Sequence, residues 1–430
     1  MVTASSRRVV IPGLCRPPVW WPGRNVARRG WLHFQPSMSA AHSRLVLFFT
    51  VLVDLIGFGI VLPILPYYAQ RLGAEGVGFG VLVGVFSLMQ FASTTLLGRL
   101  SDRVGRRPVL LATIAVNAAG YLLFAFAGSY VALLVSRVVS GFASGNVSVA
   151  QAYMADVTSA AERSRGMGLI GSAFGLGFII GPGLGGESAH RWGPMAPGLV
   201  AAGLSLLNFV SAYLVLRESL GPEHRAARSL FDLRHIADVV RRPSLRPLMA
   251  VWAIVPFAFA GYTVALPLFA GAALGWRERE LGRFFILVGA TAALVQGVLF
   301  GRLSHRFGDR GLLVAGALGM TLAIGVVPFL HSGASVYAWA FVLAFANSIF
   351  APAATGLVSA YAGPAEQGTV LGAAQAIAAL GRTTGPPAIG ALYDTMAATG
   401  AFLVSAGAML GAAMAAHRLG KREPGRRPGG

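Results

Sequence analysis

The decapeptide GRLSDRVGRR occupies residues 98–107, and a close variant, GRLSHRFGDR, occupies residues 301–310. A second motif recurs in the same way, because the run GLGFIIGPGLGG of residues 175–186 shares its glycine and proline spacing with a later segment. Both repeats follow their first copies by about 200 residues, and chance rarely places two motifs in both halves of a chain at one offset. The sequence therefore predicts a duplicated fold of two related halves. The matched positions of the second motif are Gly177, Gly181, Pro182 and Gly186 in the first half and Gly381, Gly385, Pro386 and Gly390 in the second.

The composition indicates that lipid is the solvent of this fold. Hydrophobic residues make up 55% of the chain and charged residues only 12%, whereas soluble domains carry about a quarter charged residues. Glycine and proline lie mostly inside apolar runs, and both are commoner in membrane helices than in soluble ones. A soluble chain of this length could not bury so much apolar surface.

Apolar stretches long enough to cross a bilayer recur along the chain. About 20 helical residues span a hydrocarbon core of roughly 30 Å. We expect an all-α membrane protein with twelve transmembrane helices in two six-helix bundles. The expected spans are 45–67, 78–98, 108–127, 130–155, 165–188, 195–216, 247–271, 281–301, 311–330, 335–358, 367–392 and 397–417.

The basic residues predict the orientation in the membrane. Of the 35 lysines and arginines, about 28 fall in the tails and the even-numbered loops and about 5 in the odd-numbered loops. Both termini are therefore expected in the cytoplasm, and the net charge of +19 marks this face rather than a nucleic-acid partner. The expected organisation is a basic disordered tail (1–42), a first bundle (43–216), a cytoplasmic linker with the amphipathic stretch SLFDLRHIADVVRR (217–246), a second bundle (247–417) and a basic C-terminal tail (418–430).

The N-terminal tail is left out of the expected fold. It is rich in proline and tryptophan, and it lacks the continuous apolar core of a signal peptide. Two alternatives stay open, which are an organellar transit peptide and upstream sequence that is not translated, with Met38 as the start. The single cysteine, Cys15, excludes an intramolecular disulfide, and we expect no metal site and no cofactor.

The loop between the second and third expected spans carries the most specific motif. Its glycines allow a tight turn, and an aspartate beside several arginines can pair across helix ends and release in a conformational change. The motif resembles the signature loop of the major facilitator superfamily, which implies a charge-relay latch together with Asp156. A plain positive-inside loop with a solvated Asp156 is the alternative. The expected latch residues are Gly98, Asp102, Arg103, Gly105, Arg106, Arg107 and Asp156.

Two ionisable residues lie at similar depths inside the first and fourth expected spans. An intramembrane charge is costly and by default marks a substrate or proton pathway. Asp54 lies about 15 Å from the cytoplasmic end of its helix, and Arg137 lies about 10 Å from the external end of its own. We therefore expect them to interact, with alternating access switching the protonation of Asp54. A static pair that braces two helices is the alternative.

Family resemblance supports both residues. Asp54 lies in DLIGFGIVLPILP, which is similar to the first helix of drug–proton antiporters, and Arg137 in RVVSG matches an arginine that the superfamily associates with proton coupling. The run with Gly177, Gly181, Pro182, Gly185 and Gly186 resembles the glycine-proline motif of antiporters. Generic close packing of helices with a proline kink is the alternative for this run.

A third intramembrane charge, Arg382, breaks the symmetry of the repeat. The equivalent residue of the first half is Phe178, so Arg382 is expected to bind an anionic group of the substrate or to serve as counter-ion to Asp54. Hydrogen bonding to backbone carbonyls is the alternative. Polar contacts between helices likewise explain the remaining cavity candidates equally well, which are Gln90, Tyr262, Gln296 and Asn347.

The chain from Ser43 to about His417 resembles the drug–proton antiporter branch of the major facilitator superfamily. The phrases MQF, GRLSDRVGRRPVLL and GFIIGPGLGG are similar to its tetracycline-resistance proteins. Those exporters carry acidic residues in the third and ninth helices, where this chain has Gly120 and Met320, so a lipophilic or cationic drug or an endogenous metabolite is as well supported as tetracycline.

The resemblance implies a monomeric secondary transporter of the bacterial inner (plasma) membrane. It would export a small organic solute or drug in exchange for protons, by alternating access around a mid-membrane cavity. A solute–proton symporter for uptake is the alternative within transport, and a membrane-embedded enzyme or receptor is the alternative outside it. The chain contains no HExxH, GxSxG or GxxxxGK[ST] motif, which speaks against an enzyme and against ATP as the energy source.

Overall fold

The computed structural model describes residues 40–159, 162–220, 238–239, 241–362 and 366–419. The predictions for most of the N-terminal tail, for much of the linker and for most of the C-terminal tail lie outside these residues. Within them the chain is helical and holds ten apolar segments long enough to cross a membrane, and two of these segments are of double length.

The first half contains six spans. The first is α1 (Ala40–Val61), which continues after a short break into α2 (Leu65–Arg71). The fourth is interrupted at Ser144 and Gly145. The other elements are α3 (Gly76–Val104), α4 (Arg106–Ala125), α5 (Tyr130–Ala143), α6 (Asn146–Asp156), α7 (Arg163–Trp192) and α8 (Ala196–Val215).

The second half repeats this plan with two π-helical turns. Its first span joins α10 (Arg246–Ala258), the π-turn η2 (Gly261–Ala265) and α11 (Leu266–Leu274). The rest consists of α12 (Glu278–Leu294), the π-turn η3 (Val295–Leu299), α13 (Phe300–Val326), the 3-10 turn η4 (Val327–Phe329), α14 (Gly333–Tyr361) and α15 (Gln367–His417).

Sharp turns divide both double-length segments. Gly308 inside α13 and Ala397 inside α15 have non-helical backbones with φ of 70° and 55°. The matching turns of the first half lie at Gly105 and Gly193, which also have positive φ. Counting each divided segment as two confirms the prediction of twelve transmembrane helices, and the paired turns show the duplication in the backbone.

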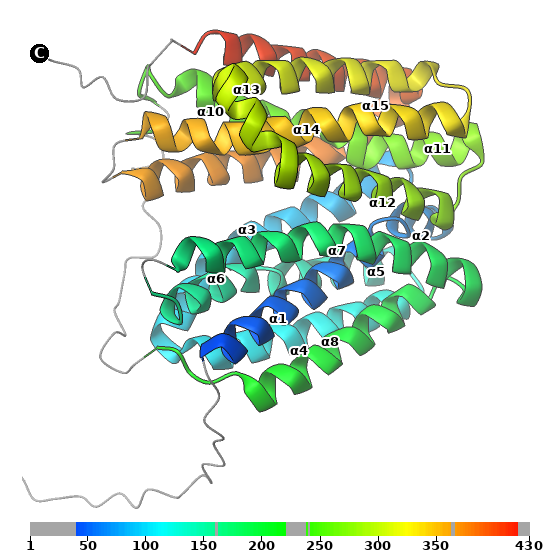
Figure 1. Cartoon of the computed structure of the whole chain (residues 1–430). Coiled ribbons are helices and arrows are strands. Elements are labelled where there is room, and N and C mark those ends of the chain that lie inside the picture. The colour runs from blue at the N-terminus through cyan, green and yellow to red at the C-terminus, as the bar shows by residue number, and fades with distance from the viewer. Residues whose placement is uncertain (1–39, 160–161, 221–237, 240, 363–365, 420–430) are drawn as a thin grey trace, which may run out of the picture. The chain divides into compact units, whose positions relative to one another are not determined.

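Each half encloses its own hydrophobic core. One cluster of buried side chains comes almost entirely from the first half, and the other comes almost entirely from the second. Figure 1 shows the two bundles, one with α1, α4 and α8 and the other with α13, α14 and α15. The start of α1 and the end of α15 lie at the same end, which we call the terminal end, and we call the opposite end the distal end.

Candidate functional site

Asp54 lies on α1 inside the first bundle, where asparagine side chains surround its carboxylate. The residue is only 8% exposed. Asn146 on α6 donates to one carboxylate oxygen at 2.5 Å, and Asn208 on α8 donates to the other at 3.5 Å. Asn117 on α4 also lies beside the carboxylate. Four helices of the first bundle therefore converge on one acidic group.

The predicted contact between Asp54 and Arg137 is not formed. Arg137 stacks its guanidinium over the ring of Phe124, 4.9 Å from the ring centroid, and its Nε donates to the Ser136 hydroxyl at 3.4 Å. Its buried Nη2 has no hydrogen-bond partner in the described part of the chain. The prediction was wrong because equal depth does not fix the direction in which a side chain leaves its helix.

Tyr121 on α4 reaches α1 close to Asp54. Its hydroxyl packs against Gly57, one turn along α1 from Asp54. No ion pair among the described residues gives Asp54 a basic partner. A buried carboxylate with only neutral neighbours is costly while charged, and a proton removes that cost. Chemically, the site can take up and release a proton.

Arg106 is the hub of the predicted latch. Its Nη1 lies 2.6 Å from Asp102, and its Nε lies 3.2 Å from Asp156 at the end of α6. Nη1 also donates to the Ser101 hydroxyl at 2.6 Å, and the residue is only 7% exposed. The structure therefore brings three of the predicted residues together. Arg103 is exposed and takes no part in these contacts.

Glu218 also belongs to this cluster, and the sequence analysis missed it. It follows the last helix of the first half and accepts hydrogen bonds from the backbone N–H groups of Arg106, at 2.8 Å, and Arg107, at 3.3 Å. These groups open α4 and have no partner within the helix. Gly105 leaves room for the carboxylate, which a Cβ at this position would overlap. An isolated acid at the start of a basic linker was the available signal.

The second copy of the latch is built differently. Asp309 occupies the place that Arg106 holds in the first half, and the Ser304 hydroxyl donates to it. Arg310 donates to the backbone carbonyl of His417 at 2.5 Å. His305, in the position of Asp102, is exposed. Opposite charges at the hub give the two halves different latches.

The glycine-proline motif forms a close contact between helices. A Cβ at Gly177, Gly181 or Gly185 would overlap α1, and one at Gly186 would overlap the backbone of α12. Pro182 lies inside α7. The motif thus lets α7 pack tightly on its own bundle and on the second bundle at once.

The two halves meet closely at the distal end. Arg71 pairs with Glu278 at 3.1 Å, and Glu187 pairs with Arg279 at 3.1 Å. Asp394 lies on α15 three residues before the sharp turn at Ala397. Its carboxylate accepts 2.8 Å hydrogen bonds from two backbone N–H groups at the start of α3. These contacts close the distal end of the structure.

The remaining cavity candidates lie on separate elements. Gln90 on α3, Asn347 on α14 and Arg382 on α15 are half-buried. Tyr262 lies in η2 with a buried hydroxyl that has no partner among the described residues, and Gln296 is exposed in η3. The structure does not join them into one hydrogen-bonded cluster, although π-turns such as η2 and η3 often mark functional sites.

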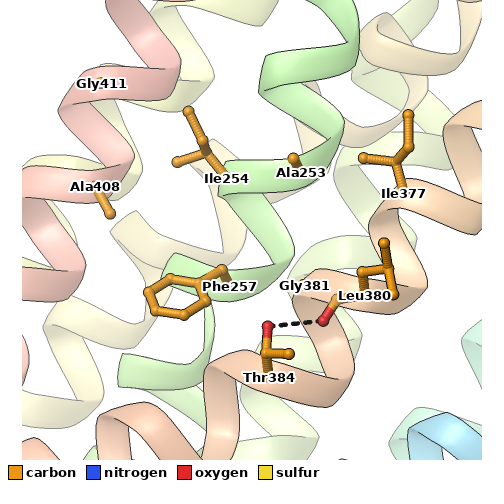
Figure 2. Close-up of a pocket in the computed structure, with 9 residues that line it drawn as sticks. All are labelled: Ala253, Ile254, Phe257, Ile377, Leu380, Gly381, Thr384, Ala408 and Gly411. Carbon is orange, nitrogen blue, oxygen red and sulfur yellow. Dashed lines mark hydrogen bonds between the residues drawn. The ribbon is translucent and has the colours of Figure 1, made fainter. Parts of the chain in front are cut away.

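Figure 2 shows a pocket of ≈ 500 Å³ between α10 and the two parts of α15. Apart from Thr384, whose hydroxyl donates to the Leu380 carbonyl at 2.8 Å, its side chains are apolar. It lies in the second bundle and includes none of the polar candidates. Its lining residues are Ala253, Ile254, Phe257, Ile377, Leu380, Gly381, Thr384, Ala408 and Gly411.

Comparison with known proteins finds similar chains of nearly the same length. The sequence profile of the Major Facilitator Superfamily matches residues 47–332 and 264–429. Major facilitator superfamily domain-containing protein 10 of Bos taurus is 32% identical, over 81% of this chain and 86% of that protein. The class D tetracycline resistance protein of Salmonella ordonez is 30% identical, over 78% and 85%. A crystal structure of the human organic anion transporter MFSD10 (TETRAN) matches with a TM-score of 0.66 and 28% identity, over 89% of this chain and all of that one.

Proposed function

Because the chain belongs to the Major Facilitator Superfamily, we propose that it exports a small organic solute in exchange for protons. Membership makes it an integral membrane transporter and not an enzyme, and it confirms the resemblance that the sequence motifs indicated. Export, proton coupling and the absence of a cofactor are the proposal. The similar proteins come from bacteria and from mammals, so the inner membrane of a bacterium stays a prediction, as do cytoplasmic termini and a monomeric state.

The surroundings of Asp54 carry the proposal. Its carboxylate is buried in the middle of a span, where a permanently charged acid would need a cation as its partner. The side chains that contact it are neutral amides instead. The asparagines around it sit on α4, α6 and α8, so a change in its charge alters contacts among four helices at once. Protonation can in this way bias the packing of the first bundle.

Contacts between the halves at the distal end supply groups that rocking of the halves would break. We expect the ion pairs Arg71–Glu278 and Glu187–Arg279 to stabilise the distal-closed state of the transporter. The close packing of α7 on α1 and α12 supports a pivot that moves the halves without separating them.

Resistance of an efflux-deficient host tests the proposal. Cells that express the chain are challenged with a panel of drugs, and we expect resistance to at least one compound that disappears with a protonophore. The Asp54→Asn variant should lose this resistance. The Glu75→Gln variant, which removes an exposed acid at the distal end, is the matched control and should keep it.

Export and uptake differ in the direction in which an inward proton gradient moves the solute. A symporter would accumulate solute in cells under an inward proton gradient, and that result would replace antiport by symport. Resistance that survives the protonophore unchanged would contradict proton coupling.

A further inference from the structure

Arg382 is a mid-membrane cation for which the described residues supply no partner. At 1.5 Å per residue it lies about 20 Å from either end of its span. Among the described residues it forms no ion pair and no hydrogen bond, including to backbone carbonyls. Asp54 is the only described acid near the middle of a span, and asparagines of the first bundle surround it. A cation in lipid needs an anion or polar partner, and none of the described side chains supplies one.

The helical positions around Arg382 give its direction. Gly381 packs against the backbone of α10, and the Thr383 carbonyl packs against Gly84 of α3. Leu380 and Thr384 line the pocket from the first part of α15, across from Ala408 and Gly411 on its last part (Figure 2). Each of these two residues is two positions from Arg382 along the chain, so it lies on nearly the opposite side of the helix, about 160° away. Arg382 therefore faces inward, between α10 of the second half and α3 of the first.

An aromatic cluster in the first half lies at the same level. The rings of Phe58 and Phe86 have centroids 5.1 Å apart, and the ring of Phe178 lies 5.8 Å from that of Phe58. Phe178 is also the residue that matches Arg382 in the repeat. Gly84 is in contact with the carbonyl of Thr383, the residue after Arg382. Phe86 follows Gly84 by two residues, a rise of about 3 Å along α3, and so lies within about 2 Å of the level of Arg382.

We propose that Arg382 is the anion-binding residue of the transport site and that the solute is an aromatic molecule with one anionic group. The guanidinium fork binds a carboxylate or sulfonate through two parallel hydrogen bonds. The rings of Phe58, Phe86 and Phe178 pack on the apolar body of the same molecule. The solute then touches both halves, as alternating access requires. This inference rests on the proposed transport function and names its substrate class.

Binding of three probes that share a naphthalene ring and carry a negative, neutral or positive group tests the assignment. The probes are 2-naphthoate, 2-naphthalenemethanol and 2-naphthylmethylammonium, and their affinities are measured by thermal shift on purified protein in detergent. Arg382→Gln should weaken the binding of 2-naphthoate at least about 10-fold, because a bond to a charged group is lost, and should leave the alcohol unchanged. Arg382→Lys should restore part of the affinity. Thr384→Ala, on the opposite face of the helix, should bind as the unmodified chain does.

Three outcomes would overturn the assignment. These are equal losses for all three probes in Arg382→Gln, unchanged binding of 2-naphthoate in that variant, and no binding of 2-naphthoate by the unmodified chain. No proton gradient is present in detergent, so the outcome of the binding assay does not depend on proton-driven transport. Selective naphthoate binding without proton-driven transport would refute the proposed function and keep the site.

Discussion

Removing the Asp394 carboxylate should loosen the distal closure between the two halves. Its oxygens accept 2.8 Å hydrogen bonds from the backbone N–H groups of Gly76 and Val77 at the start of α3. The residue that precedes this helix, Glu75, makes no capping bond with its own side chain, so the second half supplies the cap. Loss of a capping side chain costs about 1 kcal/mol. A loss of that size confined to the distal-closed state shifts the equilibrium about fivefold toward the distal-open state.

Distances between spin labels measure this shift. Labels on cysteines introduced at Arg165 and Ala360, in a Cys15→Ser background, report the separation of the two halves at the terminal end. Asp394→Ala should raise the population with a short label distance about fivefold. Glu366→Gln is the matched control, because Glu366 pairs with Arg242 inside the second half. An unchanged distance distribution in Asp394→Ala would refute the assignment of this contact to distal closure.

Three further variants test local features of the structure. Ala397→Gly should raise thermal stability by about 1 kcal/mol, because φ of 55° with ψ of −177° is a region that favours glycine; an unchanged or lower melting temperature in detergent would contradict this. Glu218→Ala should cost about 0.5 to 2 kcal/mol, because α4 loses its cap; a neutral effect would refute the capping role. Hydrogen bonds from Arg242 lower the pKa of Glu366, so the pair stabilises the fold above the ordinary glutamate pKa of about 4.3 and this contribution is lost as the pH falls through the lowered value. The difference in melting temperature between the unmodified chain and Glu366→Gln should vanish in acid, and a difference that persists there would contradict the assignment.

The duplicated fold was predictable because its signals are local. Two motifs at one spacing predicted two halves, and the length of apolar runs predicted twelve spans. The same glycines that carry the motifs also make the sharp turns, as at Gly105 and Gly308. Breaks within spans were not predicted, because Ser144 and Gly145 in the fourth span look like ordinary membrane-helix residues.

The candidate site was predictable in its charges and not in its surroundings. Asp54 and Arg382 stood out because ionisable residues are rare inside membrane helices. Asn117, Asn146 and Asn208 were missed, although each interrupts an apolar run, because polar uncharged residues also pack helices together. Only the tertiary structure shows that three helices direct them at one carboxylate.

Contacts between distant segments were beyond the sequence analysis. Glu218 lies about 110 residues from the helix that it caps, and Asp394 lies about 320 residues from α3. Nothing in the neighbourhood of either residue identifies its partner, because capping from another helix requires no local motif. The predicted contact between Asp54 and Arg137 is absent for a related reason, because the prediction compared only the depths of the two residues in the membrane.

Transport into inverted membrane vesicles tests proton coupling through Asp54 most directly. The solute is a compound to which the chain gives resistance, and the vesicle lumen is made acidic so that protons leave as solute enters. The unmodified chain should accumulate the solute and lose that accumulation with a protonophore, whereas Asp54→Asn should bind the solute without accumulating it. Accumulation by Asp54→Asn at the level of the unmodified chain would contradict the account.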